Sequence, residues 1–312
     1  MQHSIVPPVS TQHRARGFLC CAAAGAFWGC GFFFGKIALA EMNVGTMVFY
    51  RFFFATLGLL PLILTHRATF NASEWRTLLF AAFLGVPLQF LIQFKGLSLT
   101  TVSHASLMVG TMPVILAVGA TIFSKEKLHG MGWGCLVIST TGAALIALGG
   151  RHSTGANGPT LTGDMLVVVS LAIALFWVLL NKHLVHSHGA IVVTAYGMVS
   201  GALMLAIVVP FMYGIPPLHG ISAKAWAASA AAGLLCTASS TLLWNYGLSQ
   251  VPASQAGVFL NMEPLIGSLL GVFLLGEKLG PLAWIGGGLI LGAAVTLTTR
   301  SAPTAVEEPA LL

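Results

Sequence analysis

The chain has 312 residues and a formal net charge of +6; 56% of its residues are hydrophobic and 7% are charged. Soluble domains carry about a quarter charged residues, so this composition excludes an ordinary soluble fold. The basic residues form no patch interleaved with aromatic side chains, which excludes a nucleic-acid-binding surface, and their charge instead reports membrane topology and attraction to anionic lipid.

Charges, proline and glycine breaks and apolar length together predict ten helices that cross the lipid bilayer. A spanning helix needs about 20 apolar residues, and unpaired backbone groups in the hydrocarbon core are too costly for any open structure. The first predicted span is kept in the mature protein, because its apolar stretch is longer than that of a signal peptide. The predicted spans are residues 17–38, 44–65, 75–95, 102–123, 128–149, 163–181, 189–213, 224–248, 253–275 and 280–299.

Two stretches of the chain are copies of each other. Residues 96–145 and 247–296 align without a gap at an offset of 151, and 12 of the 50 aligned residues are identical. Each copy holds an apolar helix with a central proline (Pro113 and Pro264), a Glu-Lys-Leu loop and a glycine-rich helix with an early tryptophan. The chain is therefore internally duplicated.

An odd number of spans in each copy determines how the copies are inserted. Five crossings leave the chain on the opposite side of the membrane, so the second copy is inverted relative to the first. Inverted repeats are typical of secondary transporters, whose substrate site lies between the halves near the midplane. The predicted parts are an N-terminal tail (1–16), a first five-helix repeat (17–150), a linker (151–162), a second five-helix repeat (163–299) and a C-terminal tail (300–312).

Basic residues in the loops predict the orientation. With the N-terminus in the cytoplasm, eight lysines and arginines fall in inner loops or tails and five on the outer side. Basic residues accumulate on the cytoplasmic side, so both tails are predicted to be cytoplasmic and the linker extracytoplasmic.

No metal, cofactor or catalytic centre is predicted. All five cysteines fall within predicted spans without Cys-x-x-Cys spacing, which is typical of small buried apolar residues. His183, His186 and His188 lie in a connecting loop with no carboxylate or cysteine nearby in sequence, and we interpret them as interfacial polar residues. The chain has no His-Glu-x-x-His, nucleophile-elbow or phosphate-loop signature, so we predict that it is not an enzyme.

The order and spacing of several short motifs resemble a known family. Phe27-Trp28-Gly29 lies in the first span, Arg51 in the second, and Gly96-Leu97 leads through Pro113 to Glu126-Lys127-Leu128; Gly247-Leu248 leads likewise through Glu263-Pro264 to Glu277-Lys278-Leu279. Over residues 17–299 this pattern resembles the EamA family of the drug/metabolite transporter superfamily. The resemblance implies a ten-helix carrier in a bacterial inner membrane that moves small metabolites, frequently amino acids, usually outward.

Charged residues within the spans are the first candidates for function. An ionised group at the bilayer centre costs a few kcal/mol, so it usually has a partner or lines a wet cavity. Glu263 is the one acidic residue placed in mid-span, and Arg51 lies well inside its helix. Glu263 either forms a structural ion pair with Arg51 or takes part in proton coupling, and Arg51 either pairs with it or contacts substrate.

Neutral polar and aromatic residues complete the predicted cavity. Gln89 and Gln93 share a helix face just after Pro87, and the equivalent part of the second copy carries aromatic and amide side chains. Each of these residues also has a simpler explanation in helix packing and interhelical hydrogen bonding. The other candidates for an amphipathic cavity suited to a zwitterion are Trp28, His104, Trp177, Trp244, Asn245, Tyr246 and Asn261.

Three classes of function are compared: a secondary carrier, exporting either amino acids or drugs, a membrane enzyme and a scaffold. A secondary exporter of amino acids or related zwitterions accounts for the inverted duplication, the central prolines (Pro113 and Pro264) and the few buried charges. A multidrug exporter of organic cations is the alternative; small relatives in the superfamily place an essential glutamate in their first helix, and this first helix has no acidic residue. A membrane enzyme would need a cluster of His, Asp or Glu, and a scaffold would not account for duplication with odd parity. The sequence does not predict the oligomeric state.

Overall fold

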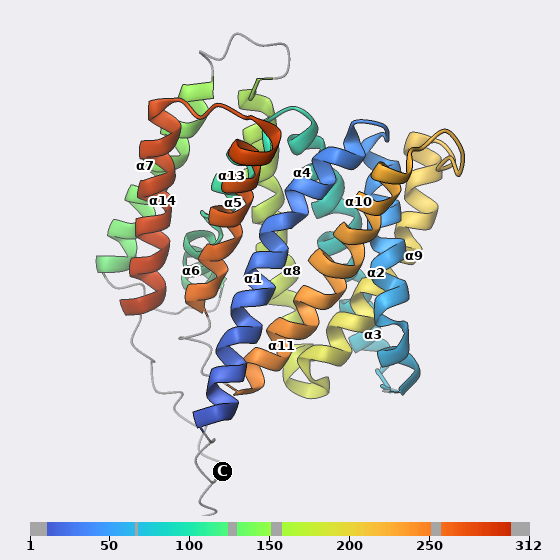
Figure 1. Cartoon of the computed structure of the whole chain (residues 1–312). Helices are drawn as coiled ribbons and strands as arrows, with labels where there is room; N and C mark the ends of the chain where they lie inside the picture. The colour runs from blue at the N-terminus through green and yellow to red at the C-terminus, as the bar shows by residue number, and fades with distance from the viewer. Residues whose placement is uncertain (1–10, 66–67, 124–129, 151–157, 251–256, 301–312) are drawn as a thin grey trace, which may run out of the picture.

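The computed structural model describes residues 11–65, 68–123, 130–150, 158–250 and 257–300, and all regular structure among them is helical. This confirms the predicted all-α class (Figure 1). The elements are α1 (Thr11–Leu39), α2 (Val44–Thr65), α3 (Ala72–Phe83), η1 (Leu84–Leu88), α4 (Gln89–Ser98), α5 (Val102–Val109), α6 (Met112–Phe123), α7 (Gly130–Gly150), α8 (Leu161–His188), α9 (Ala190–Tyr213), α10 (Ala223–Gly233), η2 (Leu234–Ser239), α11 (Ser240–Gln250), η3 (Gly257–Asn261), α13 (Met262–Leu275) and α14 (Pro281–Arg300).

Six continuous helical segments in the described residues are long and apolar enough to cross a membrane. Three of the other predicted spans correspond to shorter apolar helices, residues 130–146, 259–275 and 281–296. The predicted span 102–123 is divided into α5 and α6. Side chains that face outward fit a lipid environment: Leu203, Ile207 and Phe211 follow one another along α9 at a spacing of four and are 65%, 74% and 95% exposed.

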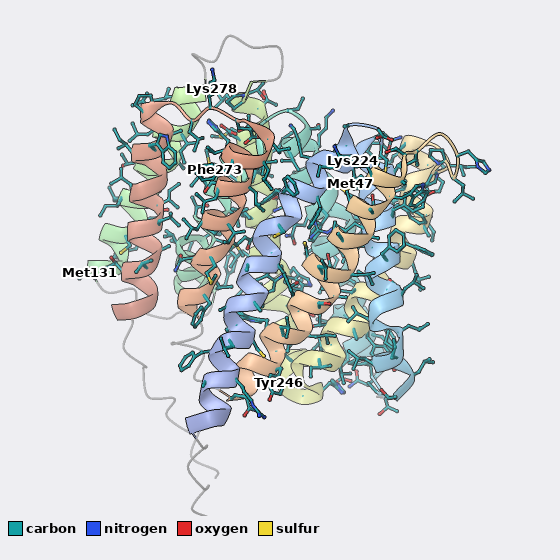
Figure 2. All side chains as sticks on the ribbon, in the orientation of Figure 1. Met47, Met131, Lys224, Tyr246, Phe273 and Lys278 are labelled. Carbon is teal, nitrogen blue, oxygen red and sulfur yellow. The ribbon has the colours of Figure 1, made fainter. Side chains whose placement is uncertain are left out.

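The ends of the helices follow the predicted up-and-down path. Helix α1 begins and α14 ends at one end of the bundle, whereas α7 ends and α8 begins at the other (Figure 1). Lys224 and Lys278 lie at the end where α8 begins, and Tyr246 lies at the opposite end (Figure 2). An odd number of crossings before residue 161 therefore separates the two copies, as inverted repeats require.

Helices from the two copies pack on each other through glycine. Helix α1 packs against α11 and α13, and α7 packs against α14. A Cβ atom at Gly29 would lie 2.8 Å from the carbonyl oxygen of Glu263, and one at Gly142 would lie 2.6 Å from that of Gly286. Both distances are shorter than van der Waals contact, so any larger residue would push these backbones apart. This close approach sets the distance between the halves.

The third helix of each copy contains a π-helical turn at the same place. Adding the repeat offset of 151 to residues 84–88 of η1 gives 235–239, which lie in η2. In η1 the wide turn contains Pro87, which has no N–H to donate. In η2 the hydroxyl of Thr237 donates to the carbonyl oxygen of Ala232, five residues earlier, at 2.9 Å. Such turns occur frequently at functional sites; η2 contacts Arg51 directly, and η1 leads into α4, whose aromatic rings face the same arginine.

Candidate substrate site

The fourth helix of each copy is interrupted close to its proline. Between α5 and α6 the helix is broken at Gly110 and Thr111, and α13 follows the 3-10 turn η3. Pro113 is the second residue of α6 and Pro264 the third of α13, so each proline begins a new helix rather than bending one. A Cβ atom at Gly110 would lie 3.5 Å from the Cβ atom of Pro264. The two breaks are therefore in contact between the copies.

Arg51 is buried next to this region, with only 6% of its surface exposed. Its Nε donates a hydrogen bond to the hydroxyl of Thr237 in η2 at 3.0 Å. The guanidinium carbon lies 5.0 Å from the ring centre of Phe90 and 5.1 Å from that of Phe94, within the range of cation–π attraction. The third helix of each copy thus contacts Arg51. In the first copy α4 supplies the aromatic rings, and in the second copy η2 supplies the hydroxyl.

Glu263 is the acidic counterpart of Arg51, but the two side chains do not form a direct ion pair. Among the described residues, no nitrogen of a basic side chain lies within 4.0 Å of the Glu263 carboxylate. Both residues contact α1, two positions apart and therefore on different faces of that helix: the backbone carbonyl of Glu263 lies against Gly29, and a Cβ atom at Gly31 would lie 3.4 Å from an Arg51 terminal nitrogen. The carboxylate also lies in the first turn of α13, where the helix dipole favours negative charge.

A tryptophan pair lies on the α11 side of α1. The ring centres of Trp28 and Trp244 are 5.4 Å apart, and both side chains are partly buried. The next residue, Asn245, has a buried side-chain nitrogen with no hydrogen-bond partner among the described residues. Gln93, one residue before Phe94, is 7% exposed, and Gln89 is partly buried one turn earlier. The structure thus places apolar and polar groups on both sides of α1.

Four predicted residues do not join this group. The His104 ring nitrogen Nδ1 lies 3.1 Å from a carboxylate oxygen of Asp164. Trp177 packs against Gly85 of η1, and Tyr246 is 44% exposed at the far end of the bundle (Figure 2). Asn261 is 8% exposed at the end of η3.

Asp164 is a buried acid that sequence reasoning assigned to a span end. It has no exposed surface and lies in the first turn of α8. One carboxylate oxygen faces His104, and the other accepts a hydrogen bond from the hydroxyl of Thr100 at 2.5 Å. The linear sequence gave no sign of these contacts, since the partners are 60 and 64 residues away.

Two further charged residues meet at the loop that joins α4 to α5. The Lys36 ammonium donates to the carbonyl oxygens of Leu97 and Thr100 at 2.9 and 2.6 Å, at the end of α4. The Glu277 carboxylate accepts from the backbone N–H groups of Val102 and Ser103, both at 2.8 Å, at the start of α5. Each charge opposes the dipole of the helix end that it caps. Together with Asp164, they fix this loop at the end of the bundle where α8 begins.

One interpretation of the sequence needs correction. His183, His186 and His188 lie in the last two turns of α8 rather than in a connecting loop. His188 also has a carboxylate neighbour. Its Nε2 lies 3.1 Å from the Glu74 carboxylate, and its ring lies 4.4 Å from that of Phe70. The side chains of His183 and His186 lie outside the described part of the structure. No group of three potential metal ligands occurs among the described residues.

A model of the EamA-like transporter family matches this chain twice, over residues 15–148 and 161–299. The chain belongs to the EamA-like transporter family. Each match contains one of the two stretches, 96–145 and 247–296, that align with each other within the chain. This EamA-like protein is therefore a membrane transporter, and its short motifs were a correct guide to the family.

Relatives of this EamA-like protein are similar over nearly its whole length. An uncharacterised transporter of Archaeoglobus fulgidus is 28% identical, covering 92% of this chain and 98% of that protein. The uncharacterised transporter YetK of Bacillus subtilis is 24% identical over 95% of this chain and 91% of its own length. A probable terminal-alkyne amino-acid exporter of Streptantibioticus cattleyicolor is 24% identical over 63% of this chain and 64% of that protein.

A solved crystal structure shares the fold of this EamA-like protein. Its TM-score is 0.64 at 15% sequence identity, and the match covers 92% of this chain and 99% of that one. At this identity the likeness concerns the fold alone. It supports the overall helical arrangement.

Proposed function

We propose that this EamA-like transporter is a secondary-active exporter of amino acids or related zwitterions. The observation that carries the proposal is a buried arginine and a partly buried glutamate, of opposite charge, that are not bonded to each other. A guanidinium and a carboxylate withdrawn from water are each costly without a partner. A zwitterion offers a carboxylate to Arg51 and an ammonium group to Glu263, so one ligand would satisfy both.

The remaining groups around the two charges suit the same class of ligand. A guanidinium binds carboxylates through two parallel hydrogen bonds, and the Arg51 terminal nitrogens have no hydrogen-bond partner among the described residues. The rings of Phe90 and Phe94 and the Trp28–Trp244 pair offer apolar surface for a side chain. The relative in Streptantibioticus cattleyicolor described as a probable amino-acid exporter is consistent with this class.

An exporter of organic cations is the weaker alternative. Glu263 could face a cation, but the positive charge of Arg51, which also contacts α1, would repel it. Glu263 could also couple transport to a proton gradient. Its carboxylate would bind either a proton or the ammonium group of the substrate, but not both, so that binding of one would release the other.

Binding measurements on purified protein test the proposal. An amino acid is compared with its methyl ester, which lacks the carboxylate, and with the corresponding acid that lacks the amino group. We expect Arg51→Gln to weaken binding of the amino acid by about 10- to 100-fold, since hydrogen bonds to charged groups are worth about 1.5–3 kcal/mol. The same variant should leave binding of the ester nearly unchanged, and Glu263→Gln should remove the preference for the amino acid over the deaminated acid.

Arg76→Gln, an exposed arginine in α3, is the matched control and should bind all three compounds like the wild type. A growth screen identifies which compound to use: cells that overproduce the transporter are challenged with toxic amino acids, dipeptides and antimetabolites. Tight binding of tetraphenylphosphonium, together with unchanged amino-acid binding by Arg51→Gln, would overturn the proposal in favour of cation export.

A further inference from the structure

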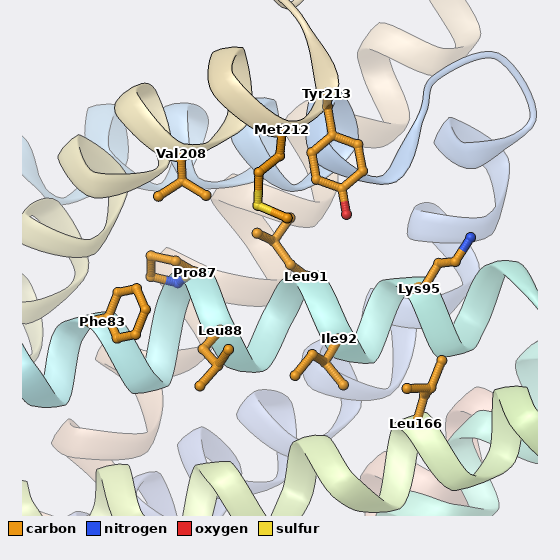
Figure 3. Close-up of a pocket in the computed structure, with 10 residues that line it drawn as sticks. All are labelled: Phe83, Pro87, Leu88, Leu91, Ile92, Lys95, Leu166, Val208, Met212 and Tyr213. Atoms are coloured by element: carbon orange, nitrogen blue, oxygen red, sulfur yellow. The ribbon is translucent and has the colours of Figure 1, made fainter.

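An apolar groove runs along the outside of the third helical segment of the first copy. It has a volume of about 250 Å³ and lies between the α3–η1–α4 segment and α9, with α8 at its base (Figure 3). Phe83, Pro87, Leu91 and Lys95 follow one another along one wall at a spacing of four. This spacing keeps the four side chains on one face, so they form a continuous strip parallel to the helix axis.

The groove ends at the membrane surface. Lys95 lies in the last turn of α4, and Tyr213 is the last residue of α9, at the same end of the bundle. Lys95 is exposed, and its ammonium has no hydrogen-bond or ion-pair partner among the described residues. Below these two residues the walls are apolar. The groove is therefore amphipathic along its length, with one cationic end.

The length of the groove matches one leaflet of the bilayer. The 12-residue separation of Phe83 and Lys95 corresponds to about 18 Å of helix. The hydrocarbon core is about 30 Å thick, so each leaflet contributes roughly half of that depth. A peptide helix that crossed the membrane would extend well beyond the groove, whereas the acyl chain of a single phospholipid would not.

We propose that this groove binds an anionic phospholipid, with one acyl chain along the wall from Leu91 to Phe83 and the headgroup phosphate at Lys95. The Tyr213 hydroxyl points into the groove near Lys95 and provides a hydrogen-bond donor for the headgroup (Figure 3). Charge complementarity selects an anionic headgroup, because each lysine near a membrane surface favours anionic lipid by several-fold. The apolar strip selects an acyl chain rather than a free phosphate ion.

The bound lipid contacts the back of the helix that forms the substrate site. Phe90 and Phe94 of α4 face Arg51, and residues two apart on an α-helix lie on nearly opposite sides. Leu88 and Ile92 therefore line the groove while Phe90 and Phe94 contact the arginine. Pro87 of the π-helical turn also lines the groove. A lipid in this position supports α4 and the wide turn from the outside.

Lipid binding to the purified, delipidated transporter tests the inference. Phosphatidylglycerol and phosphatidylcholine with the same acyl chains are added, and bound lipid is counted by native mass spectrometry. We expect the wild type to retain phosphatidylglycerol in preference to phosphatidylcholine. Lys95→Gln should reduce this preference about fivefold. Lys278→Gln, an exposed lysine at the same end of the bundle, is the matched control and should leave it unchanged.

A second pair of variants tests the acyl chain. Leu91→Trp fills the groove and should reduce retention of both lipids, whereas Leu203→Trp on the lipid-facing side of α9 should not. If Leu91→Trp does not fold, Met212→Trp fills the groove from its more exposed wall. Equal retention by wild type and both groove variants would overturn the inference. Displacement of the lipid by glycerol phosphate would also overturn it, because it would show a phosphate site without an acyl-chain site.

The readout separates this inference from the proposed function. Lipid retention is measured without substrate, so loss of amino-acid binding in Arg51→Gln would not affect it. Displacement of the lipid by an amino acid would contradict the lipid site, because the groove would then belong to the transport path.

Discussion

The Glu277 carboxylate accepts hydrogen bonds from both the backbone N–H and the hydroxyl of Ser103, at 2.8 and 2.7 Å. Glu277 belongs to the Glu-Lys-Leu loop of the second copy, whereas Ser103 lies in the first turn of α5 of the first copy. One side chain therefore caps a helix that belongs to the other half of the duplication. Lys36 caps the preceding helix end with the opposite charge.

Replacing Glu277 should destabilise the folded transporter. Glu277→Ala removes three hydrogen bonds to a charged group and leaves the first N–H groups of α5 without their partner. We expect a loss of about 1.5–3 kcal/mol, measured as a lower melting temperature in detergent. The adjacent exposed residue gives the control, since Lys278→Ala should melt like the wild type. Identical melting of the two variants would show that the cap contributes nothing.

The His104–Asp164 pair should behave as one unit. His104→Ala and Asp164→Ala each leave a buried polar partner unsatisfied, so each should cost about 1–3 kcal/mol. The double variant should cost less than the sum of the two, because it leaves neither group alone. The control is Ser170, whose hydroxyl donates to the carbonyl oxygen of Val167 in its own helix. The destabilisation by Ser170→Ala should simply add to that by Asp164→Ala. Additive effects of His104→Ala and Asp164→Ala would contradict the coupling.

The two prolines should matter for transport more than for folding. Pro113 and Pro264 occupy first-turn positions, where proline fits without loss of a helical hydrogen bond. Replacement by alanine allows each helix to extend backwards through its break. We therefore expect Pro113→Ala and Pro264→Ala to accumulate near wild-type levels with reduced flux, compared by immunoblot and by uptake into inverted vesicles. Unimpaired flux in the double variant would reduce the prolines to packing features.

Acid should weaken one contact between the copies outside the membrane. Glu41, between α1 and α2, accepts from the Ser222 hydroxyl at 2.6 Å and backbone N–H at 2.7 Å. The hydroxyl bond, followed by the backbone bond, lowers the pKa of Glu41 below its usual value. Because the pKa of Glu41 is lowered, the contact is fully present above the ordinary glutamate pKa. It is lost as the pH falls through the lowered pKa of the folded protein. Hydrogen exchange at the start of α10 should therefore rise below about pH 4 in the wild type. It should already be high at neutral pH in Glu41→Gln.

The orientation of the bundle can be read by labelling in intact cells. In a background without native cysteines, Lys278→Cys should react with a membrane-impermeant maleimide. Arg76→Cys should react only after permeabilisation, because basic residues in its loop are predicted to be cytoplasmic. The reverse pattern would invert the predicted orientation while leaving the fold unchanged.

The sequence was a sound guide wherever one helix at a time decides the structure. Apolar length correctly predicted the six long apolar helices of the described residues, and the duplicated prolines marked the interrupted helices. Arg51 and Glu263 were found because an ion in a spanning segment is conspicuous on its own. Their separation was not predictable, because it depends on how α2, η2 and α13 pack around α1.

Contacts between distant segments were beyond such reasoning. Ser103 and Glu277 are 174 residues apart, and no periodicity connects them. Asp164 lies four residues after the N-cap Thr160 of α8 and would be solvated in an isolated helix. It is buried here because α5 brings His104 to it, and only the assembled bundle specifies that contact.

The two π-helical turns change which face of the third helix points inward in both copies. A π turn holds one residue more than the α-helix around it, and that residue rotates everything beyond it by about 100° about the helix axis. Since η1 and η2 occupy equivalent places in the two copies, the third helix of each copy carries the same rotation beyond its wide turn. The residues around the turn differ between the copies. The first copy has Pro87 in the turn and directs the aromatic rings of α4 toward Arg51, whereas the second has Thr237, whose hydroxyl accepts a hydrogen bond from that arginine.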